Sequence, residues 1–354
     1  MINVWSWCAG ETSWAQHGRQ LLRALDRRHP VALVPLPNPA QPVPAELRAM
    51  VERGRSPDLR QPGLSIGPFE STRRVAGAWR AGLVVWETTR LSRQKVDMVR
   101  ALDEVWTPSE WGRRLLADNG VDEGRVRVVP EGVDTEVFRT VPRARLGGEP
   151  FRFLCVGRWT LRKGVDDLVA AYCAEFGPDE PVELVLHCWC PYQPGFNLQT
   201  RIARAAPRPH APIVASMPLP VAGLADLYNR CDAFVLATRG EGWGLPIFEA
   251  MACGLPAIIT DYSAPAEYMD ESIAYPLRVE RMIDVDEPFF FERGAGQWAQ
   301  PDVAHLRALM RHVVENREEA FAKGQRAAEA VRRRWTWDHA AATAYALLED
   351  KIRS

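Results

Sequence analysis

A strand, a glycine-rich loop and a short helix follow one another in residues 233–254, and this order limits what the chain can fold into. The apolar run at 233–237 is typical of a buried strand in a parallel sheet. Pro246 suits the first position of a helix, and Gly254 suits the end of one. The loop between them turns tightly and approaches other groups closely because it contains Gly240, Gly242 and Gly244. The segment therefore predicts one βα unit of an α/β fold.

The N-terminus of this helix is a predicted anion site. The backbone N–H groups of Gly244, Leu245 and Ile247 are expected to point out of the helix, where the helix dipole also favours negative charge. Two carboxylates, Glu241 and Glu249, flank these groups in the sequence. One interpretation of Glu249 is a residue that merely complements the dipole. The interpretation we favour is that both carboxylates accept hydrogen bonds from ligand hydroxyl groups, with the ligand's phosphates on the N–H groups.

Strands alternate with helices along both halves of the 354 residues, which is typical of doubly wound α/β sheets. Strands are expected at 2–7, 31–36, 83–86, 104–107 and 126–130, and then at 151–156, 182–187, 213–216, 233–237 and 257–260. In residues 48–80 we expect only short helices and loops. The Pro- and Gly-containing stretch 140–150 is typical of a linker. We therefore predict a first domain over 1–139 and a second over 151–335.

Composition and charge narrow the class of protein. Hydrophobic residues make up 47% of the chain, and 44 basic residues balance 45 acidic ones, so a folded core is expected and a nucleic-acid partner is not. Residues 71–100 hold seven basic and two acidic residues. This excess would suit an anionic acceptor or a peripheral membrane contact, although a solvated face is the simpler interpretation. The seven cysteines, odd in number and mostly in apolar runs, indicate buried thiols in a reducing compartment.

The N-terminus and the apolar runs also bear on location. No apolar run reaches the length of about 18 residues that a membrane span needs. The chain begins directly with a predicted strand and without the pattern of a signal peptide. We therefore expect a cytoplasmic protein. The alternative is a cytoplasmic protein that also contacts the inner face of the membrane peripherally.

Two cations follow the predicted strand at 151–156. Arg158 and Lys163 lie five positions apart in a loop that opens the next helix. Because the ends of parallel strands meet at one edge of a sheet, we expect both cations near the predicted anion site. Arginine can bond two phosphate oxygens at once, and lysine supplies a compact charge. Two solvated surface cations are the alternative, but beside a helix N-terminus the pair fits a diphosphate.

The sequence resembles the GT-B glycosyltransferases of the large retaining family 4. The resemblance rests on Glu241-x7-Glu249 inside EGWGLPIFEAMACGLP, and it is supported by GR and RKG within 157–164, VPEGVD at 129–134, APAE at 264–267 and WTW at 335–337. It is strongest over 104–138 and 151–270. It implies two doubly wound Rossmann-like domains facing across a cleft, the first for the acceptor and the second for a nucleotide sugar. It also implies that a last helix, about 336–354, returns to the first domain.

The resemblance assigns the donor to residues of the second domain. Arg158 and Lys163 would hold its pyrophosphate. Glu249 would take the ribose hydroxyls, and Glu241 would take hydroxyls of the transferred sugar. Backbone contacts would come from the glycine loop and the helix start, that is, from Gly242, Gly244 and Leu245.

The negative charge that forms during the reaction explains why cations are expected in such a site. Breaking the bond between sugar C1 and oxygen places negative charge on the leaving diphosphate, where Arg158 and Lys163 are expected to lie. No metal ion is then required, and Asp284 and Asp286 are expected to be surface residues. Retention of the anomeric configuration is implied by the resemblance alone.

The first domain departs from the family pattern. The family often has a glycine pair after the first strand, whereas this chain has only Gly10, followed by Glu11. Where the family often has a histidine that contacts the sugar, this chain has Glu87. Glu87 is either a group that contacts donor or acceptor or a structural partner of Arg90. Ser109 is expected to cap a helix, and the loops at Gly10, Glu87 and Ser109 are expected to line the acceptor side.

The predicted function is retaining transfer of a hexose-type sugar from a nucleoside diphosphate sugar to a hydroxyl acceptor. The acceptor would be a glycan, a lipid-linked intermediate or a small natural product, and neither cofactor nor metal is expected. The catalytic candidates are Glu241, Arg158, Lys163 and Glu87.

Two alternatives remain at this point. One is a GT-B nucleotide-sugar epimerase or a phosphorylase, and the other is a non-catalytic scaffold that binds a nucleotide sugar. A phosphorylase with pyridoxal phosphate needs a buried lysine, whereas Lys95, Lys323 and Lys351 lie in polar stretches of the sequence.

Overall fold

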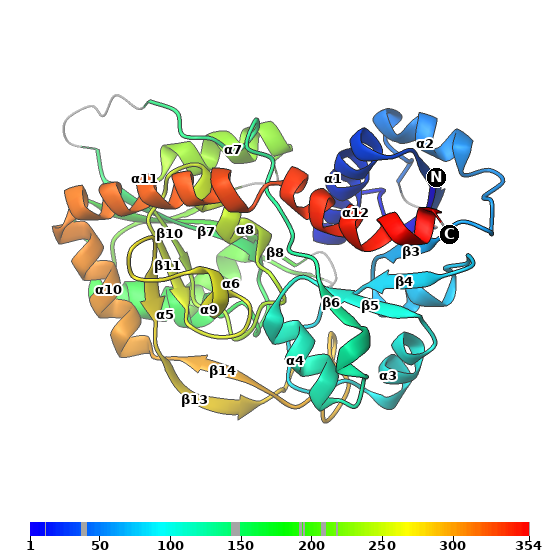
Figure 1. The fold of residues 1–354 in the computed structure, drawn as a ribbon. Helices are drawn as coiled ribbons and strands as arrows, with labels where there is room; N and C mark the ends of the chain where they lie inside the picture. The colour runs from blue at the N-terminus through cyan, green and yellow to red at the C-terminus, as the bar shows by residue number, and fades with distance from the viewer. Residues whose placement is uncertain are drawn as a thin grey trace. The chain divides into compact units, whose positions relative to one another are not determined.

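The computed structural model describes residues 1–10, 12–36, 41–142, 149–190, 193, 195–206, 210–216 and 219–353. The chain divides into two compact units. The first comprises Met1–Gly132, Gly294–Gly296 and Trp335–Ser354, and the second comprises Val133–Arg293 and Gln297–Arg334. Each unit contains its own parallel sheet of six strands with helices around it, so the predicted α/β fold class is confirmed (Figure 1).

The sheet of the first unit has the strand order β2-β1-β3-β4-β5-β6, and all neighbours pair in parallel. Its strands are β1 (Ile2–Ser6), β2 (Val31–Pro35), β3 (Gly63–Ile66), β4 (Arg80–Leu83), β5 (Glu104–Thr107) and β6 (Val126–Val128). Its helices are α1 (Ser13–Arg28), α2 (Arg48–Arg53), α3 (Arg93–Arg100), α4 (Glu110–Asp118) and α12 (Trp337–Arg353), with 3-10 turns η1 (Ala45–Leu47), η2 (Phe69–Arg73) and η3 (Glu123–Arg125). The last helix, α12, packs against α1 (Figure 1).

Two strands of this sheet differ from the sequence prediction. The region 48–80, where only short helices and loops were expected, contains β3 between β1 and β4. This strand has four residues, all buried, so it is too short to show a diagnostic alternation of apolar and polar residues. The second difference is β4, which ends at Leu83. The predicted strand 83–86 is therefore mostly the loop that leads to Glu87.

The sheet of the second unit has the strand order β12-β11-β10-β7-β8-β9, again with parallel pairing throughout. Its strands are β7 (Phe151–Arg158), β8 (Val182–Trp189), β9 (Ile213–Ala215), β10 (Ala233–Leu236), β11 (Ala257–Thr260) and β12 (Tyr275–Leu277). Its helices are α5 (Val165–Glu175), α6 (Leu198–Ala205), α7 (Val221–Arg230), α8 (Leu245–Ala252), α9 (Pro265–Tyr268), α10 (Val303–Glu315) and α11 (Arg317–Arg334).

An antiparallel hairpin interrupts this pattern. Its strands β13 (Val279–Asp284) and β14 (Gln297–Pro301) pair only with each other. No sequence signal that we used predicted it. β13 is mostly exposed and follows directly on β12, and β14 buries the adjacent residues Trp298 and Ala299, so neither strand alternates between buried and exposed positions. The loop between its strands contains Gly294–Gly296, which belong to the first unit.

Strand order places two loops side by side in the second unit. β10 pairs with β7, so the loops that follow these strands leave the same edge of the sheet next to each other. They are the loop from β7 to α5, with Lys163, and the loop from β10 to α8, with Glu241. The core beneath them is apolar and includes some of the cysteines, all seven of which are buried thiols, as the sequence predicted.

Candidate active site

The loop from β7 to α5 is shaped by the end of β10. β7 extends to Arg158, so this residue ends a strand and does not lie in the loop, contrary to the prediction. Gly164 stands at the N-cap of α5 with φ +64°. A side chain there would place its Cβ 1.9 Å from the carbonyl oxygen of Ala237, which follows β10. Glycine is therefore required for the two loops to lie this close together.

The loop from β10 to α8 ends in a glycine N-cap. Gly244 has φ +105°, and α8 starts at Leu245, so Pro246 occupies the second helical position instead of the predicted first. The N–H of Ile247 donates to the carbonyl oxygen of Gly244 at 2.9 Å. The prediction that the Ile247 N–H is available to a ligand is therefore wrong, because the first turn of the helix uses it.

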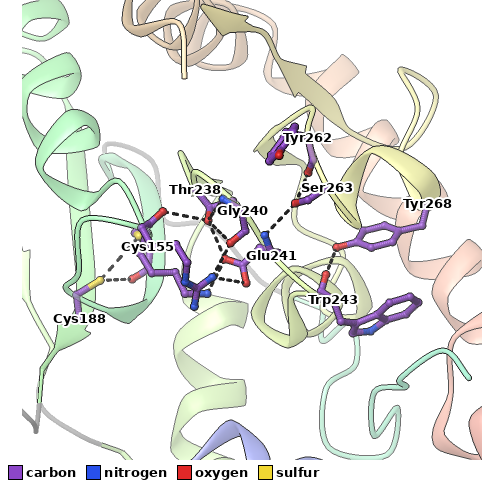
Figure 2. A network of polar contacts seen from close by, with 11 residues as sticks. Cys155, Cys188, Thr238, Gly240, Glu241, Trp243, Tyr262, Ser263 and Tyr268 are labelled. Carbon is purple, nitrogen blue, oxygen red and sulfur yellow. Dashed lines mark hydrogen bonds and ion pairs between the residues drawn. The ribbon is translucent and has the colours of Figure 1, made fainter. Parts of the chain in front are cut away.

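Aromatic rings support this loop from one side. The ring of Trp243 stacks on Phe248 with 4.8 Å between the centroids, and Tyr268 contacts both rings. The Tyr268 hydroxyl donates to the carbonyl oxygen of Trp243 at 2.5 Å (Figure 2). The packing fixes the backbone just before the helix start, where Gly244 was predicted to approach the donor.

A buried cluster of three charges joins the two loops. The ammonium of Lys163 lies 2.7 Å from one carboxylate oxygen of Glu241, and the guanidinium of Arg162 lies 3.2 Å from the other. Arg162, Lys163 and Glu241 are 6%, 8% and 4% exposed. Arg162 also donates to the carbonyl oxygen of Gly240 at 2.6 Å. In the sequence analysis, Arg162 occurs only within the RKG motif and is given no role. Its position next to Lys163 could have identified it as a second basic residue of the site.

The charge state of Glu241 follows from these neighbours. Burial by itself would raise the pKa of the carboxyl group, but the charges of Lys163 and Arg162 outweigh burial and lower its pKa to about 2. Hydrogen bonds from Lys163 and from the Thr238 hydroxyl, the latter at 2.9 Å, act in the same direction. Glu241 is therefore an anion at neutral pH. Burial lowers the pKa of Lys163, and the negative charge of Glu241 opposes this effect.

The backbone of Glu241 is held by Ser263. The Glu241 N–H donates to the Ser263 hydroxyl oxygen at 2.9 Å, and the Ser263 hydroxyl donates to the carbonyl oxygen of Tyr262 at 2.6 Å (Figure 2). Ser263 has φ +59°, an uncommon conformation for a residue other than glycine. A strained residue beside a site is a functional hint that the sequence could not give.

Arg239 connects the two loops to the hairpin. Its buried guanidinium bonds Asp167 of α5 at 2.6 Å, Gln300 of β14 at 2.9 Å and the carbonyl oxygen of Leu161. The backbone N–H of Arg239 donates to the carbonyl oxygen of Arg162 at 2.7 Å. The segment 161–163 is thus fixed from both its side chains and its backbone.

Glu249 lies in α8, one of whose neighbours is α7. The hydroxyl of Tyr228, a buried residue of α7, donates to Glu249 at 2.9 Å and reaches the carbonyl oxygen of Pro246 at 3.2 Å. Glu249 is itself buried. Tyr228 thus orients the carboxylate that was predicted to take ribose hydroxyls.

The hairpin contributes two further side chains beside Arg158. The ring of Phe290 lies 5.4 Å from the Arg158 guanidinium carbon. A carboxylate oxygen of Glu287 accepts from the Leu161 N–H at 2.6 Å, and its other oxygen is buried with no hydrogen-bond partner. Burial raises the pKa of Glu287. Neither residue was singled out from the sequence.

The acceptor-side predictions concern the first unit. Gly10, φ +94°, follows β1, and its carbonyl oxygen accepts from Arg19. Ser109 follows β5 and caps α4, accepting from the Gly112 N–H at 3.1 Å, which confirms its predicted capping role. Glu87 is half-buried in the loop after β4. Glu11 lies outside the described residues.

A buried contact between a histidine and a carboxylate in the first unit was not anticipated. His17 of α1 lies 2.9 Å from Glu131 through its Nδ1, and both side chains are buried. The His17 ring also contacts Trp337 of α12, with 5.4 Å between centroids. His17 is buried because α12 covers this face of α1.

The described residues offer neither a metal site nor a membrane span. Among the described side chains, no three His, Cys, Asp or Glu residues are grouped so that they could hold a metal ion. Asp284 and Asp286 are exposed, as predicted. Lys323, placed by its sequence in a polar stretch, is instead buried, and its ammonium donates to the carbonyl oxygen of Glu271 at 2.6 Å. None of the helices in the described ranges is both long and apolar enough to cross a membrane.

A comparison with protein families agrees with this geometry. The family described as Family 4 Glycosyltransferase in conflict systems matches residues 109–344, the larger part of the chain. The chain belongs to the family 4 glycosyltransferases.

Individual curated relatives match parts of this family 4 chain. The D-inositol 3-phosphate glycosyltransferase of Xylanimonas cellulosilytica is 32% identical over 238 residues, which are 63% of this chain and 51% of that protein. The chain spans about half the length, or less, of the curated relatives it matches.

Solved structures show the same architecture. The sucrose-phosphate synthase of Thermosynechococcus elongatus has a TM-score of 0.73 at 17% identity, over 99% of this chain and 98% of that one. Anabaena HepE in complex with UDP-glucose has a TM-score of 0.71 at 12% identity, over 99% of both chains. At these identities the likeness shows the GT-B fold alone.

Proposed function

We propose that this chain is a retaining glycosyltransferase that moves a hexose-type sugar from a nucleoside diphosphate sugar to a hydroxyl acceptor without a metal ion. The observation that carries the proposal is the meeting of basic side chains at the paired strand ends. Arg162 and Lys163 both contact the carboxylate of Glu241 in a buried site, in the two loops that lead to α5 and α8. Buried basic groups are stabilised by anions, and a diphosphate is an anion that such groups bind.

Each donor group has a physical role in this proposal. Arg158 and Lys163 hold the pyrophosphate, with Arg162 behind them. Gly242, Gly244 and Leu245 bring backbone groups to the phosphates at the start of α8, where the helix dipole is favourable. Glu249, oriented by Tyr228, accepts from the ribose hydroxyls. That HepE was solved with UDP-glucose supports a nucleotide sugar as the donor.

Glu241 has a more restricted role than hydroxyl binding alone. Its two oxygens are engaged by Lys163 and Arg162, so it sets the position of both cations. A carboxylate oxygen has more than one lone pair, and Glu241 can still accept from a sugar hydroxyl. In this proposal Glu241 therefore links the transferred sugar to the cations that receive the leaving group.

The reaction places its charge where the cations lie. The bond between sugar C1 and the diphosphate oxygen breaks, and its electron pair goes to the diphosphate. The acceptor hydroxyl oxygen bonds to C1 on the same face, and its proton passes to the leaving phosphate oxygen. Preorganised cations stabilise this charge without reorganisation at the moment of reaction. Glu87 is proposed to act on the sugar or the acceptor.

Two measurements test this proposal. A thermal-shift screen of UDP-, GDP-, ADP- and TDP-sugars identifies the donor, because a ligand that binds only the folded state raises its apparent stability. Release of the matching nucleoside diphosphate, with the anomeric configuration of the product read by NMR, then tests turnover and retention. A folded protein that neither binds nor cleaves any of the four donors contradicts the proposal. Product of inverted configuration contradicts its retaining part.

A further inference from the structure

Three consecutive phenylalanines in the loop between β13 and β14 differ strongly in exposure. Phe291 is buried, and its ring meets Trp298 edge-on with 5.8 Å between centroids. Phe290 is half-buried beneath the guanidinium of Arg158. Phe289 packs edge-to-face on Phe290 at 4.8 Å and is 65% exposed. Two rings thus anchor the loop, and the third is displayed on the surface.

The same loop is attached to the proposed donor site. The carboxylate of Glu287 accepts from the Leu161 N–H at 2.6 Å, two residues before Lys163. Its second oxygen is buried and has no hydrogen-bond partner. Because that oxygen is closed to solvent, Glu287 ties the loop to the segment that carries Lys163. The displayed ring of Phe289, two positions further along the chain, is thereby anchored to the proposed donor site.

The groups proposed to bind the donor are more deeply buried than the ring of Phe289. Lys163 and Glu241 are buried, Arg158 is half-buried, and Phe290 lies against Arg158. Phe289 is the next ring outward and is mostly exposed. A ligand ring that contacts Phe289 therefore lies outside the groups proposed to hold the diphosphate and the transferred sugar, which is where an acceptor is expected.

The surroundings of Phe289 favour a carbohydrate over a lipid. The loop also carries the exposed charged residues Asp286, Glu292 and Arg293. A surface that inserts into a bilayer needs a contiguous apolar face, and carboxylates at this density oppose it. A pyranose ring has one face of C–H groups and a rim of hydroxyls. Such a ring matches an aromatic side chain in a loop that also carries exposed charged residues.

We propose that Phe289, supported by Phe290, is an acceptor platform that stacks against a pyranose ring, so that the acceptor is a carbohydrate. This inference rests on the proposed function and adds the class of acceptor to it. Aromatic contacts of this kind contribute enough that removing the ring is expected to weaken acceptor binding about fivefold.

Four proteins test the platform: wild type, Phe289→Ala, Phe289→Tyr and Phe321→Ala. Phe321 of α11 is the matched control, because it is a phenylalanine with nearly the same exposure, 63%, outside the site. The acceptor probes are the methyl glycosides of glucose, mannose, galactose and N-acetylglucosamine, with the donor identified by thermal shift. We expect the KM for the best pyranoside to rise about fivefold in Phe289→Ala and to change little in Phe289→Tyr or Phe321→Ala. Equal values in Phe289→Ala and Phe321→Ala overturn the inference.

Direct binding keeps the inference independent of turnover. Ligand-observed NMR with the same methyl glycosides is expected to show saturation transfer in wild type and its loss in Phe289→Ala. No transfer to any of the four pyranosides in wild type overturns the inference. Binding of wild type to vesicles of phosphatidylglycerol and phosphatidylcholine that is lost in Phe289→Ala also overturns it, in favour of a lipid acceptor. Failure of the proposed function itself appears separately, as a folded wild-type protein that neither binds nor cleaves any of the four donors.

Discussion

The ammonium of Lys163 lies 2.7 Å from the carboxylate of Glu241, although 78 residues separate them in the chain. Both side chains are buried, and Arg162 completes the cluster from the same loop as Lys163. An ion pair removed from water is strongly destabilised when one partner is lost, because the remaining charge stays buried. The cluster therefore couples the stability of the second unit to the groups proposed to bind the donor.

Lys163→Met tests this coupling. The variant leaves Glu241 with Arg162 as its one remaining cation in the cluster, and we expect unfolding to become easier by about 3 kcal/mol. Loss of one preorganised cation is expected to lower kcat by about 10²-fold or more. Chemical denaturation and donor cleavage measure the two effects. Lys351→Met, on α12, is the matched control and should stay within about 0.5 kcal/mol of wild type. Wild-type cleavage by Lys163→Met would remove Lys163 from the donor site.

The low pKa of Glu241 predicts how stability depends on pH. Its folded-state pKa of about 2 lies below the ordinary value of 4.5, so the folded state favours the ionised form. The stabilisation is therefore fully present above about pH 5 and is lost as the pH falls toward 2, by about 3 kcal/mol in total. Denaturation of wild type and Glu241→Gln between pH 7 and pH 3 should show a gap that narrows with acid. Glu318→Gln, an exposed carboxylate of α11, serves as the control. A gap that widens with acid contradicts the assignment.

The parts of the site that could be predicted are those whose residues lie close together in the sequence. The β10–loop–α8 unit was predicted closely because glycines, proline and an apolar strand occur within about twenty residues of one another, each with its own backbone reason. Lys163 was expected near the anion site, but its direct ion pair with Glu241 was not predicted, since that contact depends on β10 lying beside β7. The use of the Ile247 N–H by Gly244 also depended on where the helix began.

The elements that the sequence missed share a different property. β3 has four residues and is buried on both faces, so no periodicity distinguishes it from an apolar loop. The strands of the β13–β14 hairpin pair only with each other; β13 is mostly exposed, and β14 buries two adjacent residues, so neither shows an alternating pattern. As a result, Glu287 and Phe290 were not identified as site residues, although they contact Leu161 and Arg158.

Gly164→Ala should damage the junction between the two loops. Its added Cβ would lie 1.9 Å from the carbonyl oxygen of Ala237, so β10 or α5 must move. Gly195→Ala is the matched control, because Gly195 also has a positive φ, +72°, but has no atom within 4 Å of the added Cβ. We expect about 1 kcal/mol of destabilisation for Gly195→Ala and about 3 kcal/mol for Gly164→Ala. Equal unfolding midpoints would show that the close approach to Ala237 is unimportant.

Chelation tests the metal-free part of the proposal. Because Arg158, Arg162 and Lys163 supply the positive charge, donor cleavage is expected to persist after incubation with EDTA and gel filtration. Adding Mg²⁺ or Mn²⁺ afterwards should not change the rate. Metal content of the filtered protein is measured in parallel, so that a retained ion is detected. A loss of cleavage that Mg²⁺ restores would contradict the proposal and point to charge stabilisation by a metal ion instead.

Tyr228→Phe separates the orientation of Glu249 from general stability. The variant removes a hydroxyl that donates to Glu249 at 2.9 Å and reaches the carbonyl oxygen of Pro246 at 3.2 Å. We expect destabilisation of about 1–2 kcal/mol and weaker binding of the donor nucleotide, because Glu249 is no longer held in place. Tyr172→Phe is the matched control, since the buried Tyr172 hydroxyl lies 3.1 Å from two backbone carbonyl oxygens, those of Val182 and Pro212, and donates its single proton there. It should lose similar stability and keep wild-type affinity for the nucleotide, measured by calorimetric titration at a temperature where both variants are folded. Equal nucleotide affinities in the two variants would show that Tyr228 does not position Glu249 for the ribose.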